Sequence, residues 1–330
     1  MLRSTLAGSY PRVSDAPLPV NLRQMLHKHD RREISDAELE HAYEATITRI
    51  VNEQESAGID LLTDGQIRWD DLLTPITRQL DGAKPGGLLR YFDNNVYYRH
   101  PVIQGPIRWR GPATVDDYRT AAGATRRPVK AVLPGPITYA VLAEDRAYKN
   151  FEMLARAVSE ALHQEALALQ EAGAPLIQID EPALGGQPAR LALARACMET
   201  IARGLKTKVG IATYFKPVQE IWTGLRAFPV QVWQVDVADR PAQLDMVLNA
   251  PPDGEVVFGC MDARNTRLEE RDTLARTLER ATDRLGADRV WASPNAGLEF
   301  LPHATAQKKM ARLAEAVGAV NGRTAGTAAR

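Results

Sequence analysis

The chain has few of the residue types that usually mark a metal centre, a disulfide scaffold or a nucleic-acid interface. Its 330 residues include two cysteines and six histidines, and 41 basic side chains balance 41 acidic ones. A formal net charge of zero gives no electrostatic reason to expect nucleic acid or an anionic membrane as a partner. Two cysteines are too few for a disulfide framework, and we expect Cys197 and Cys260 to be reduced, buried thiols.

Long hydrophobic runs and several well-known catalytic motifs are absent as well. Every apolar run is shorter than the roughly 18–20 residues that a membrane helix needs. The N-terminal segment MLRSTLAGSYPR has no hydrophobic stretch of the signal-peptide type. The sequence contains no Gly-x-Ser-x-Gly elbow, no P-loop and no Cys/His spacing for zinc. We therefore expect a cytoplasmic globular protein that uses other side chains for its function.

What the sequence does contain is a repeated unit, in which a short apolar run ends in polar, glycine or proline residues, usually before an amphipathic stretch. Near-continuous apolar runs are typical of parallel strands buried on both faces. Eight strands alternating with helices predict an α/β fold, the (β/α)8 TIM barrel. A doubly wound open sheet is the alternative, but no glycine fingerprint follows the first run. The eight runs are 3–10, 58–65, 129–136, 175–182, 208–215, 230–237, 255–262 and 289–297.

Helix and loop signals support a single domain. Ser35 and Glu38 form a capping-box pattern before a helix that ends at Gly58. Between the second and third strands, an alternating, aromatic-rich stretch predicts an inserted β-hairpin over about 86–112, with a turn at Asp93-Asn94-Asn95. The hairpin is either a lid or a packing element. We predict one barrel over residues 1–320 and a flexible tail over 321–330.

Polar residues at the strand ends are the candidates for function, because active sites of this barrel type lie at the carboxyl ends of the strands. Any one of them could instead cap a helix or bind a loop amide, but several together predict a pocket. The predicted catalytic residues are Asp180, Tyr214, Asp236 and Arg264. The predicted substrate-binding residues are Ser9, Asp64, Gln66, Thr138, Glu181, Thr213 and Asn295.

The histidines lie away from the strand ends. His41 and His163 fall in predicted helices, where we expect surface positions. His27 and His29 lie in a polar stretch and are expected to be solvated. His303 follows the loop after the last strand and is the one histidine placed to reach a pocket rim.

Taken together, the strand-end segments resemble the catalytic barrel of the cobalamin-independent methionine synthase family. The closest pattern is its short single-barrel form, within the uroporphyrinogen-decarboxylase-like barrel group. The resemblance implies a TIM barrel and methyl transfer from a folate or corrinoid donor. It also implies that Ser9 receives an amino-acid carboxylate and Asp180 the amino group. The matching segments are GSYPR, TDGQ, LPGPIT, QIDEPAL, VDVADR, CMDARNTRLE and SPNAGL, in the family's order.

The sequence departs from the family where the zinc ligands are expected. The family's His-x-Cys motif at the end of the fifth strand is matched by Ile211 and Thr213, and a later cysteine by Ala296. A family glutamate has Asp236 or Val237 near its place. One carboxylate without imidazole or thiolate cannot hold zinc in four-coordinate N/S geometry. We therefore expect no zinc site of the family type.

Other substitutions affect the expected substrate contacts. Gln66 stands where the family has a glutamate for the amino group, and a neutral amide loses the charge-assisted bond to an ammonium. Arg264 stands in place of a histidine used in methyl transfer. Gly186 and Leu142 fall near the family's folate contacts, so a folate or corrinoid donor finds no support in these residues.

These observations predict a zinc-free relative that transfers a methyl or one-carbon group to or from a small amino-acid-like or carboxylate substrate. A zinc-independent lyase is the first alternative, performing elimination, decarboxylation or C–S cleavage with Asp180, Asp236, Tyr214 and Arg264. A non-catalytic binding protein is the second. The expected partner is a small molecule, with a methyl-donor protein or a second copy of the chain as further options.

Overall fold

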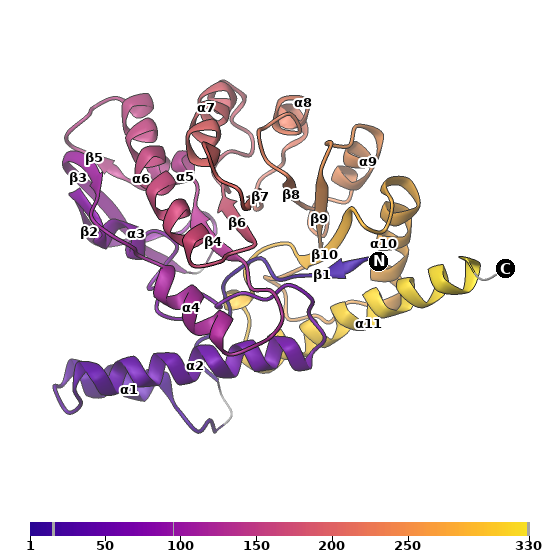
Figure 1. Ribbon diagram of the computed structural model, residues 1–330, viewed down its shortest axis with the longest axis horizontal. Helices are drawn as coiled ribbons and strands as arrows, with labels where there is room; N and C mark the ends of the chain where they lie inside the picture. The colour runs from indigo at the N-terminus through magenta and orange to yellow at the C-terminus, as the bar shows by residue number, and fades with distance from the viewer. Residues whose placement is uncertain (15–16, 95, 329–330) are drawn as a thin grey trace.

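The centre of the molecule is a sheet of parallel strands curled into a barrel, in the order β1-β10-β9-β8-β7-β6-β4 (Figure 1). The computed structural model describes residues 1–14, 17–94 and 96–328. Nearly all the side chains of these strands are buried, as the apolar runs predict. The strands are β1 (Arg3–Ser4), β4 (Ala131–Pro134), β6 (Leu176–Asp180), β7 (Lys208–Thr213), β8 (Val232–Asp236), β9 (Glu255–Met261) and β10 (Val290–Pro294).

Two residues close the barrel where the second strand is expected. Leu61 pairs in parallel with Thr5, and Leu62 with Val129. Only these single bridges form, because the chain leaves the extended conformation at Gly65 and Gln66, whose φ angles are 72° and 55°. The prediction of a (β/α)8 barrel is confirmed, with its second strand shortened from 58–65 to these bridges.

Helices cover the outside of the barrel, and the long α2 and α11 lie along one side of it (Figure 1). The capping box is present: Ser35 accepts from Glu38 N, and the Glu38 carboxylate accepts from Ser35 N. Helix α11 continues through the stretch predicted as a tail, and residues 329–330 lie outside the described part. The helices are α1 (Leu22–Asp30), α2 (Asp36–Ser56), α3 (Thr74–Arg78), α4 (Val115–Gly123), α5 (Pro136–Leu142), α6 (Phe151–Glu171), α7 (Leu191–Ala202), α8 (Trp222–Leu225), α9 (Ala242–Asn249), α10 (Arg271–Leu285) and α11 (His303–Ala328), with short 3₁₀ turns η1 (Pro188–Arg190), η2 (Gln219–Ile221) and η3 (Leu298–Phe300).

The inserted hairpin consists of β2 (Leu80–Arg90) and β3 (Tyr97–Trp109), and β5 (Glu144–Asp145) extends it in parallel beside β3. It begins before the predicted 86–112, because the antiparallel pairing already starts between Leu80 and Trp109. Of the predicted turn, Asp93 and Asn94 are described and Asn95 lies outside the described residues. The base of the hairpin packs on α6, where Trp109 Nε1 donates to Glu165 Oε2 at 2.8 Å.

Two burial predictions have different outcomes. Cys197 and Cys260 are both free, buried thiols, as expected. His163 is not on the surface: its side chain is buried and its Nδ1 lies 3.1 Å from Ile201 O. This hydrogen bond to helix α7 compensates the burial of the imidazole. In the described part of the chain, every helix is too short or too polar to cross a bilayer.

Candidate active site

A cavity of about 410 Å³ opens at the carboxyl ends of the barrel strands. Three loops are tied together around it by backbone hydrogen bonds from Tyr10 N to Gly65 O and from Leu298 N to Ser9 O. The end of the hairpin covers one side. The cavity is lined by Ala7, Gly8, Ser9, Tyr10, Pro11, Arg12, Val13, Gln66, Asp70, Asp71, Leu72, Tyr91, Val96, Tyr97, Asp180, Tyr214, Phe215, Gly297, Glu299, Phe300 and Leu301.

Asp180 and Tyr214 form a hydrogen-bonded pair in this cavity. The Tyr214 hydroxyl donates to Asp180 Oδ2 at 2.9 Å, and Gln178 Nε2 donates to Oδ1 at 2.7 Å. Burial raises the pKa of Asp180 to about 7, although both hydrogen bonds and the charge of Lys130 oppose that shift. Burial and the Asp180 charge also raise the pKa of Tyr214 well above its usual value. Asp180 therefore exchanges a proton near neutral pH, while Tyr214 stays protonated as a donor.

A buried lysine lies beneath this pair inside the barrel. Lys130 Nζ donates to Gln178 Oε1 at 2.6 Å, and the same amide donates to Asp180. Burial lowers the pKa of Lys130 to about 7, and the Asp180 carboxylate opposes the shift. Sequence analysis missed Lys130, although a single charge inside the apolar run VKAVL was a usable signal.

The end of β7 presents different residues to the cavity from those expected. Gln178 pairs in register with Gly210 and Asp180 with Ala212, so Ala212 and Tyr214 share the inner face. Ile211 and Thr213 alternate with them and face outward, and Thr213 Oγ1 donates to Gln234 O at 3.1 Å. The two residues that match the family's ligand motif, Ile211 and Thr213, are therefore not among the lining residues of the cavity.

Ser9 and Glu299 face each other across two of the loops. They are hydrogen-bonded, and a Cβ on Gly297 would lie 1.8 Å from Ser9 Oγ. The Glu299 side chain is exposed, and desolvation by the protein around its carboxyl raises its pKa. Sequence analysis predicted Ser9 at the site and missed Glu299, which lies in a short 3₁₀ turn after the last strand.

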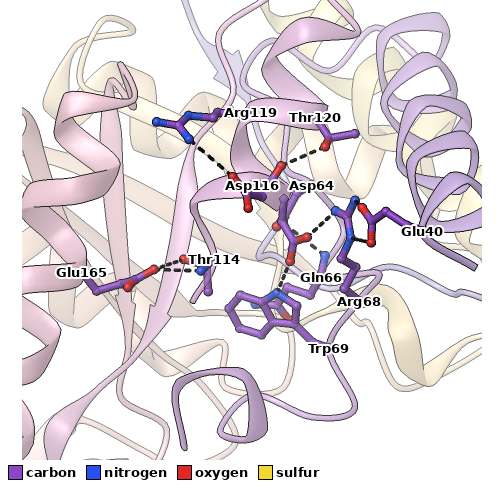
Figure 2. A network of polar contacts seen from close by, with 11 residues as sticks. Glu40, Asp64, Gln66, Arg68, Trp69, Thr114, Asp116, Arg119, Thr120 and Glu165 are labelled. Atoms are coloured by element: carbon purple, nitrogen blue, oxygen red, sulfur yellow. Dashed lines mark hydrogen bonds and ion pairs between the residues drawn. The ribbon is translucent and has the colours of Figure 1, made fainter. Parts of the chain in front are cut away.

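Gln66 lines the cavity, and Asp64 supports it from behind. Asp64 Oδ1 accepts from Gln66 N at 3.1 Å, which holds Gln66 at its positive φ. Burial, followed by the nearby Asp117 charge, raises the pKa of Asp64 to about 7. Figure 2 shows the adjoining network, in which Arg68 binds Glu40. Arg68 also binds Asp117. Asp64 thus lies next to the cavity wall and is not part of its lining.

Thr138 and Glu181 stabilise the start of α5. The Glu181 carboxylate accepts from Ile137 N at 2.9 Å and from Thr138 N and Oγ1 at 2.8 and 2.7 Å. A carboxylate at a helix N-terminus satisfies free amides there. Burial nevertheless raises the pKa of Glu181 to about 7. Neither residue lines the cavity.

Asp236 and Asn295 bind each other at 3.2 Å between two strand ends. Asp236 also accepts from Ala238 N and Asp239 N, and Asn295 accepts from Ala263 N. Burial raises the pKa of Asp236 to about 6. These contacts shape the loops around the cavity, and neither side chain is among its lining residues.

Arg264 is exposed and lines a neighbouring cavity that shares Glu299 and Phe300 with this one. Its guanidinium pairs with Asp239, is 3.4 Å from Asn94 Oδ1 in the hairpin, and lies over the Phe215 ring at 5.2 Å. It thereby connects the loop after β9 to the hairpin. His303 is buried beneath Tyr10, with Nε2 2.8 Å from Glu53 Oε2. The structure therefore gathers Ser9, Gln66, Asp180 and Tyr214 in one cavity, and places Arg264 and His303 outside it.

Comparison with known proteins identifies the family of the chain. The sequence profile of the cobalamin-independent synthase catalytic domain matches residues 2–319. The chain belongs to this family. Curated methionine synthases of Sulfurisphaera tokodaii and Saccharolobus solfataricus are 28% and 26% identical to it, covering 94% and 96% of this chain and 90% and 93% of theirs. A B12-independent methionine synthase from a Shewanella species, solved with selenomethionine, superposes with a TM-score of 0.86 at 21% identity over 99% of both chains, which shows the shared fold.

The zinc chemistry implied by the cobalamin-independent synthase family finds no matching donor set in this cavity. The polar groups around Asp180 are hydroxyls, an amide and carboxylates, from Ser9, Tyr214, Gln66 and Glu299. Zinc sites of this type need imidazole or thiolate donors. Within residues 1–14, 17–94 and 96–328, no three His, Cys, Asp or Glu side chains are grouped so that they could hold a metal. The residues present do not fit the family's zinc ion.

Proposed function

We propose that this member of the cobalamin-independent synthase family transfers a methyl or one-carbon group to or from a small amino-acid-like or carboxylate substrate, without zinc. The observation that carries the proposal is the Asp180–Tyr214 pair in a cavity at the carboxyl ends of the family's barrel. Relatives of this chain are named methionine synthases, which supports methyl transfer as the type of reaction. We expect the protein to act in the cytoplasm.

In this proposal, side chains of the protein take the proton from the attacking nucleophile. In a zinc enzyme the metal would do this by binding the nucleophile as a thiolate. The Asp180 carboxylate binds a substrate ammonium or accepts the proton of the attacking nucleophile, and a pKa of about 7 suits that exchange. Tyr214 orients the carboxylate by donating to Oδ2. Ser9 and the Gln66 amide offer hydrogen bonds to a carboxylate or carbonyl. The methyl donor, a folate or a corrinoid on a partner protein, belongs to the same proposal.

A lyase is the second candidate, favoured by the neutral-range acid Asp180 beside a protonated phenol. Of the four groups expected to serve such a reaction, only Asp180 and Tyr214 line the cavity. A lyase would therefore use this pair as base and acid, and Asp236 and Arg264 would act only through the loops they hold.

Label transfer distinguishes these functions. Purified protein is incubated with a small thiol and a donor carrying a labelled methyl group, once with chelator and once with added zinc. Label should reach the thiol equally in both samples, and Asp180→Asn should abolish the transfer. A rate that depends on zinc would contradict the zinc-free mechanism. Substrate cleavage without label transfer would identify a lyase, and ligand binding with no product would identify a binding protein.

A further inference from the structure

Four aromatic rings gather at one side of the cavity. Tyr214 and Phe215 follow β7, Tyr91 follows β2, and Phe300 lies in η3. The Phe215 ring centroid is 4.6 Å from that of Tyr214, 6.1 Å from Tyr91 and 5.9 Å from Phe300. All four side chains line the cavity. A ligand there meets aromatic faces and edges, which attract positive charge at their faces.

Two acidic side chains also line the cavity where these rings meet it. Asp180 and Glu299 line it, and among the residues that the structure describes their side chains are hydrogen-bonded to neutral groups, Gln178 and Tyr214 for Asp180 and Ser9 for Glu299. The other acids are engaged elsewhere: Asp70 pairs with Arg78, and Asp71 caps the start of α3. The one cation in the lining, Arg12, donates to Trp69 O at 2.6 Å. Asp180 and Glu299 thus line the cavity outside any direct ion pair among the described residues, while the charges of Lys130 and Arg12 act on them and lower their pKa values against the larger upward effect of burial.

One buried donor beside the rings has no partner. Gln66 Nε2 makes no hydrogen bond to any residue in the described part of the chain, whereas the Tyr91 hydroxyl is hydrogen-bonded to that of Tyr214. Both residues line the cavity, and Tyr91 is 6% exposed. A buried donor without an acceptor is costly, so such groups usually find one in a ligand or an ordered water. A ligand carboxylate supplies an acceptor for Gln66 Nε2 and an alternative to Glu299 as the acceptor for the Ser9 hydroxyl.

We propose that the cavity binds a small zwitterion that carries a methylated onium group, a quaternary ammonium or a sulfonium, together with a carboxylate. The onium group lies among Tyr91, Tyr214 and Phe300, near the carboxylates of Asp180 and Glu299. A methylated onium donates no N–H hydrogen bond, so aromatic faces and diffuse negative charge are what recognise it. The identity of the cavity as the active site rests on the proposed function; the binding chemistry rests on these residues.

An onium ligand is also a methyl donor that needs neither folate nor zinc. The bond from the methyl carbon to nitrogen or sulfur breaks, and its electron pair stays on that heteroatom. The methyl carbon forms a new bond to the sulfur of an acceptor thiol, and the thiol proton passes to the Asp180 carboxylate. One positive and one negative charge disappear together, so the cavity keeps its net charge through the step. A low-dielectric site favours a reaction that neutralises opposite charges.

Calorimetric titration of the whole protein tests the binding directly. The probes are glycine betaine and dimethylsulfoniopropionate, compared with tert-butylacetate, which has the shape of glycine betaine but no positive charge. At least one onium probe should bind about tenfold or more tightly than the carbon isostere, as a desolvated cation–aromatic contact supports. Glycine betaine binding would identify an ammonium site, and preference for the other probe a sulfonium site.

Two variants that each remove one aromatic ring test whether the preference for an onium ligand arises in the cavity. Phe300→Leu should weaken binding of the preferred onium by about tenfold and leave binding of tert-butylacetate unchanged. Phe92→Leu is the matched control, because Phe92 contacts the same ring cluster but does not line the cavity; it should bind onium as the wild type does. Circular dichroism melts verify that both variants are folded.

Equal binding of onium and isostere, or binding of neither, would overturn the onium site. Because calorimetry needs no turnover, this result is separate from the label-transfer test. Onium selectivity without transfer to a thiol would keep the site and contradict the proposed function. Transfer from a methyl-folate in a protein that ignores onium probes would keep the function and contradict the site.

Discussion

Tyr214 Oη donates to Asp180 Oδ2 at 2.9 Å, across the boundary between β6 and β7. The register of the two strands sets this contact, because Asp180 pairs with Ala212 and Tyr214 lies two residues further on the same face. The carboxylate therefore reaches the cavity already oriented, with Gln178 holding its other oxygen. Preorganised groups of this kind need little rearrangement when a ligand arrives.

Replacing Asp180 by Asn should remove function without removing the fold. The amide has the same shape and avoids burying a charge, so we expect the melting temperature to change by only a few degrees. Activity or ligand affinity should fall by about 100-fold or more, because an amide neither accepts a proton nor pairs with a cation. Asp245→Asn is the control, since that aspartate is exposed and pairs with Arg280. An Asp180→Asn variant with unchanged kcat/KM would remove Asp180 from the mechanism.

Lys130→Met should shift the pH dependence of the site. The lysine charge lowers the pKa of Asp180, against the larger upward effect of burial. Without that charge, the pKa of Asp180 rises further, and the pH at which activity or cation binding reaches half its maximum should increase by about one unit. A pH series of kcat/KM, or of onium affinity, measures the shift. An unchanged midpoint with reduced stability would show that Lys130 only fills the barrel.

The outcome at β7 shows what sequence patterns predict well and what they do not. Apolar runs located the strands within a few residues, because burial on both faces leaves little freedom of composition. Which side of the sheet each side chain faces can be known only from the register between neighbouring strands. A shift of one residue moves every side chain to the opposite face. For this reason Thr213 was predicted to bind substrate, whereas Ala212 shares the inner face of the strand with Asp180 and Tyr214 lines the cavity.

The residues missed at the site came from segments whose packing is non-local. Tyr91 lies in the hairpin, and nothing in its sequence neighbourhood indicates contact with Phe215 more than a hundred positions later. Glu299 and Phe300 belong to a short 3₁₀ turn that carries no periodic pattern. Conversely, Thr138 and Glu181 were expected to bind substrate but instead bind each other at the start of α5. The same polar residue types occur at strand ends and at helix caps, so the sequence does not distinguish the two roles.

Asp64→Asn should make stability less dependent on pH. Burial raises the folded-state pKa of Asp64 to about 7, from an unfolded value near 4. Between those values the folded state holds the proton more tightly, so the contribution of Asp64 to stability is present at low pH and lost as the pH rises through about 7. The variant should unfold like the wild type near pH 4 and be more stable by roughly 2 kcal/mol near pH 8. Urea titrations at both values test this, and equal stability at pH 8 would contradict a buried, raised Asp64.

Glu181→Gln should destabilise the fold and leave the chemistry of the cavity intact. Two backbone amides and the Thr138 hydroxyl donate to the carboxylate, and an amide NH₂ in that place would face donors instead of accepting from them. The cost of such unsatisfied groups is about 2–3 kcal/mol of unfolding free energy. Denaturant midpoints measure it, at a temperature where the variant is folded and its ligand affinity can be compared. A fully stable variant with lost affinity would instead make Glu181 a substrate contact.

Gly297→Ala should block the cavity by displacing one hydroxyl. Gly297 has φ −59° and ψ 145°, a conformation that alanine adopts freely, so the effect is steric and not a matter of backbone strain. The new Cβ would lie 1.8 Å from Ser9 Oγ and 3.2 Å from Ser9 Cβ, which forces the hydroxyl away from Glu299 and from a bound carboxylate. We expect affinity for the carboxylate ligand to fall by about tenfold or more.

Gly318→Ala is the control, because nothing lies within 4 Å of its added Cβ, and in helix α11 it should raise stability by about 0.5–1 kcal/mol. Titration calorimetry and thermal melts of both variants separate the two effects, and wild-type affinity in Gly297→Ala would exclude Ser9 from the carboxylate site.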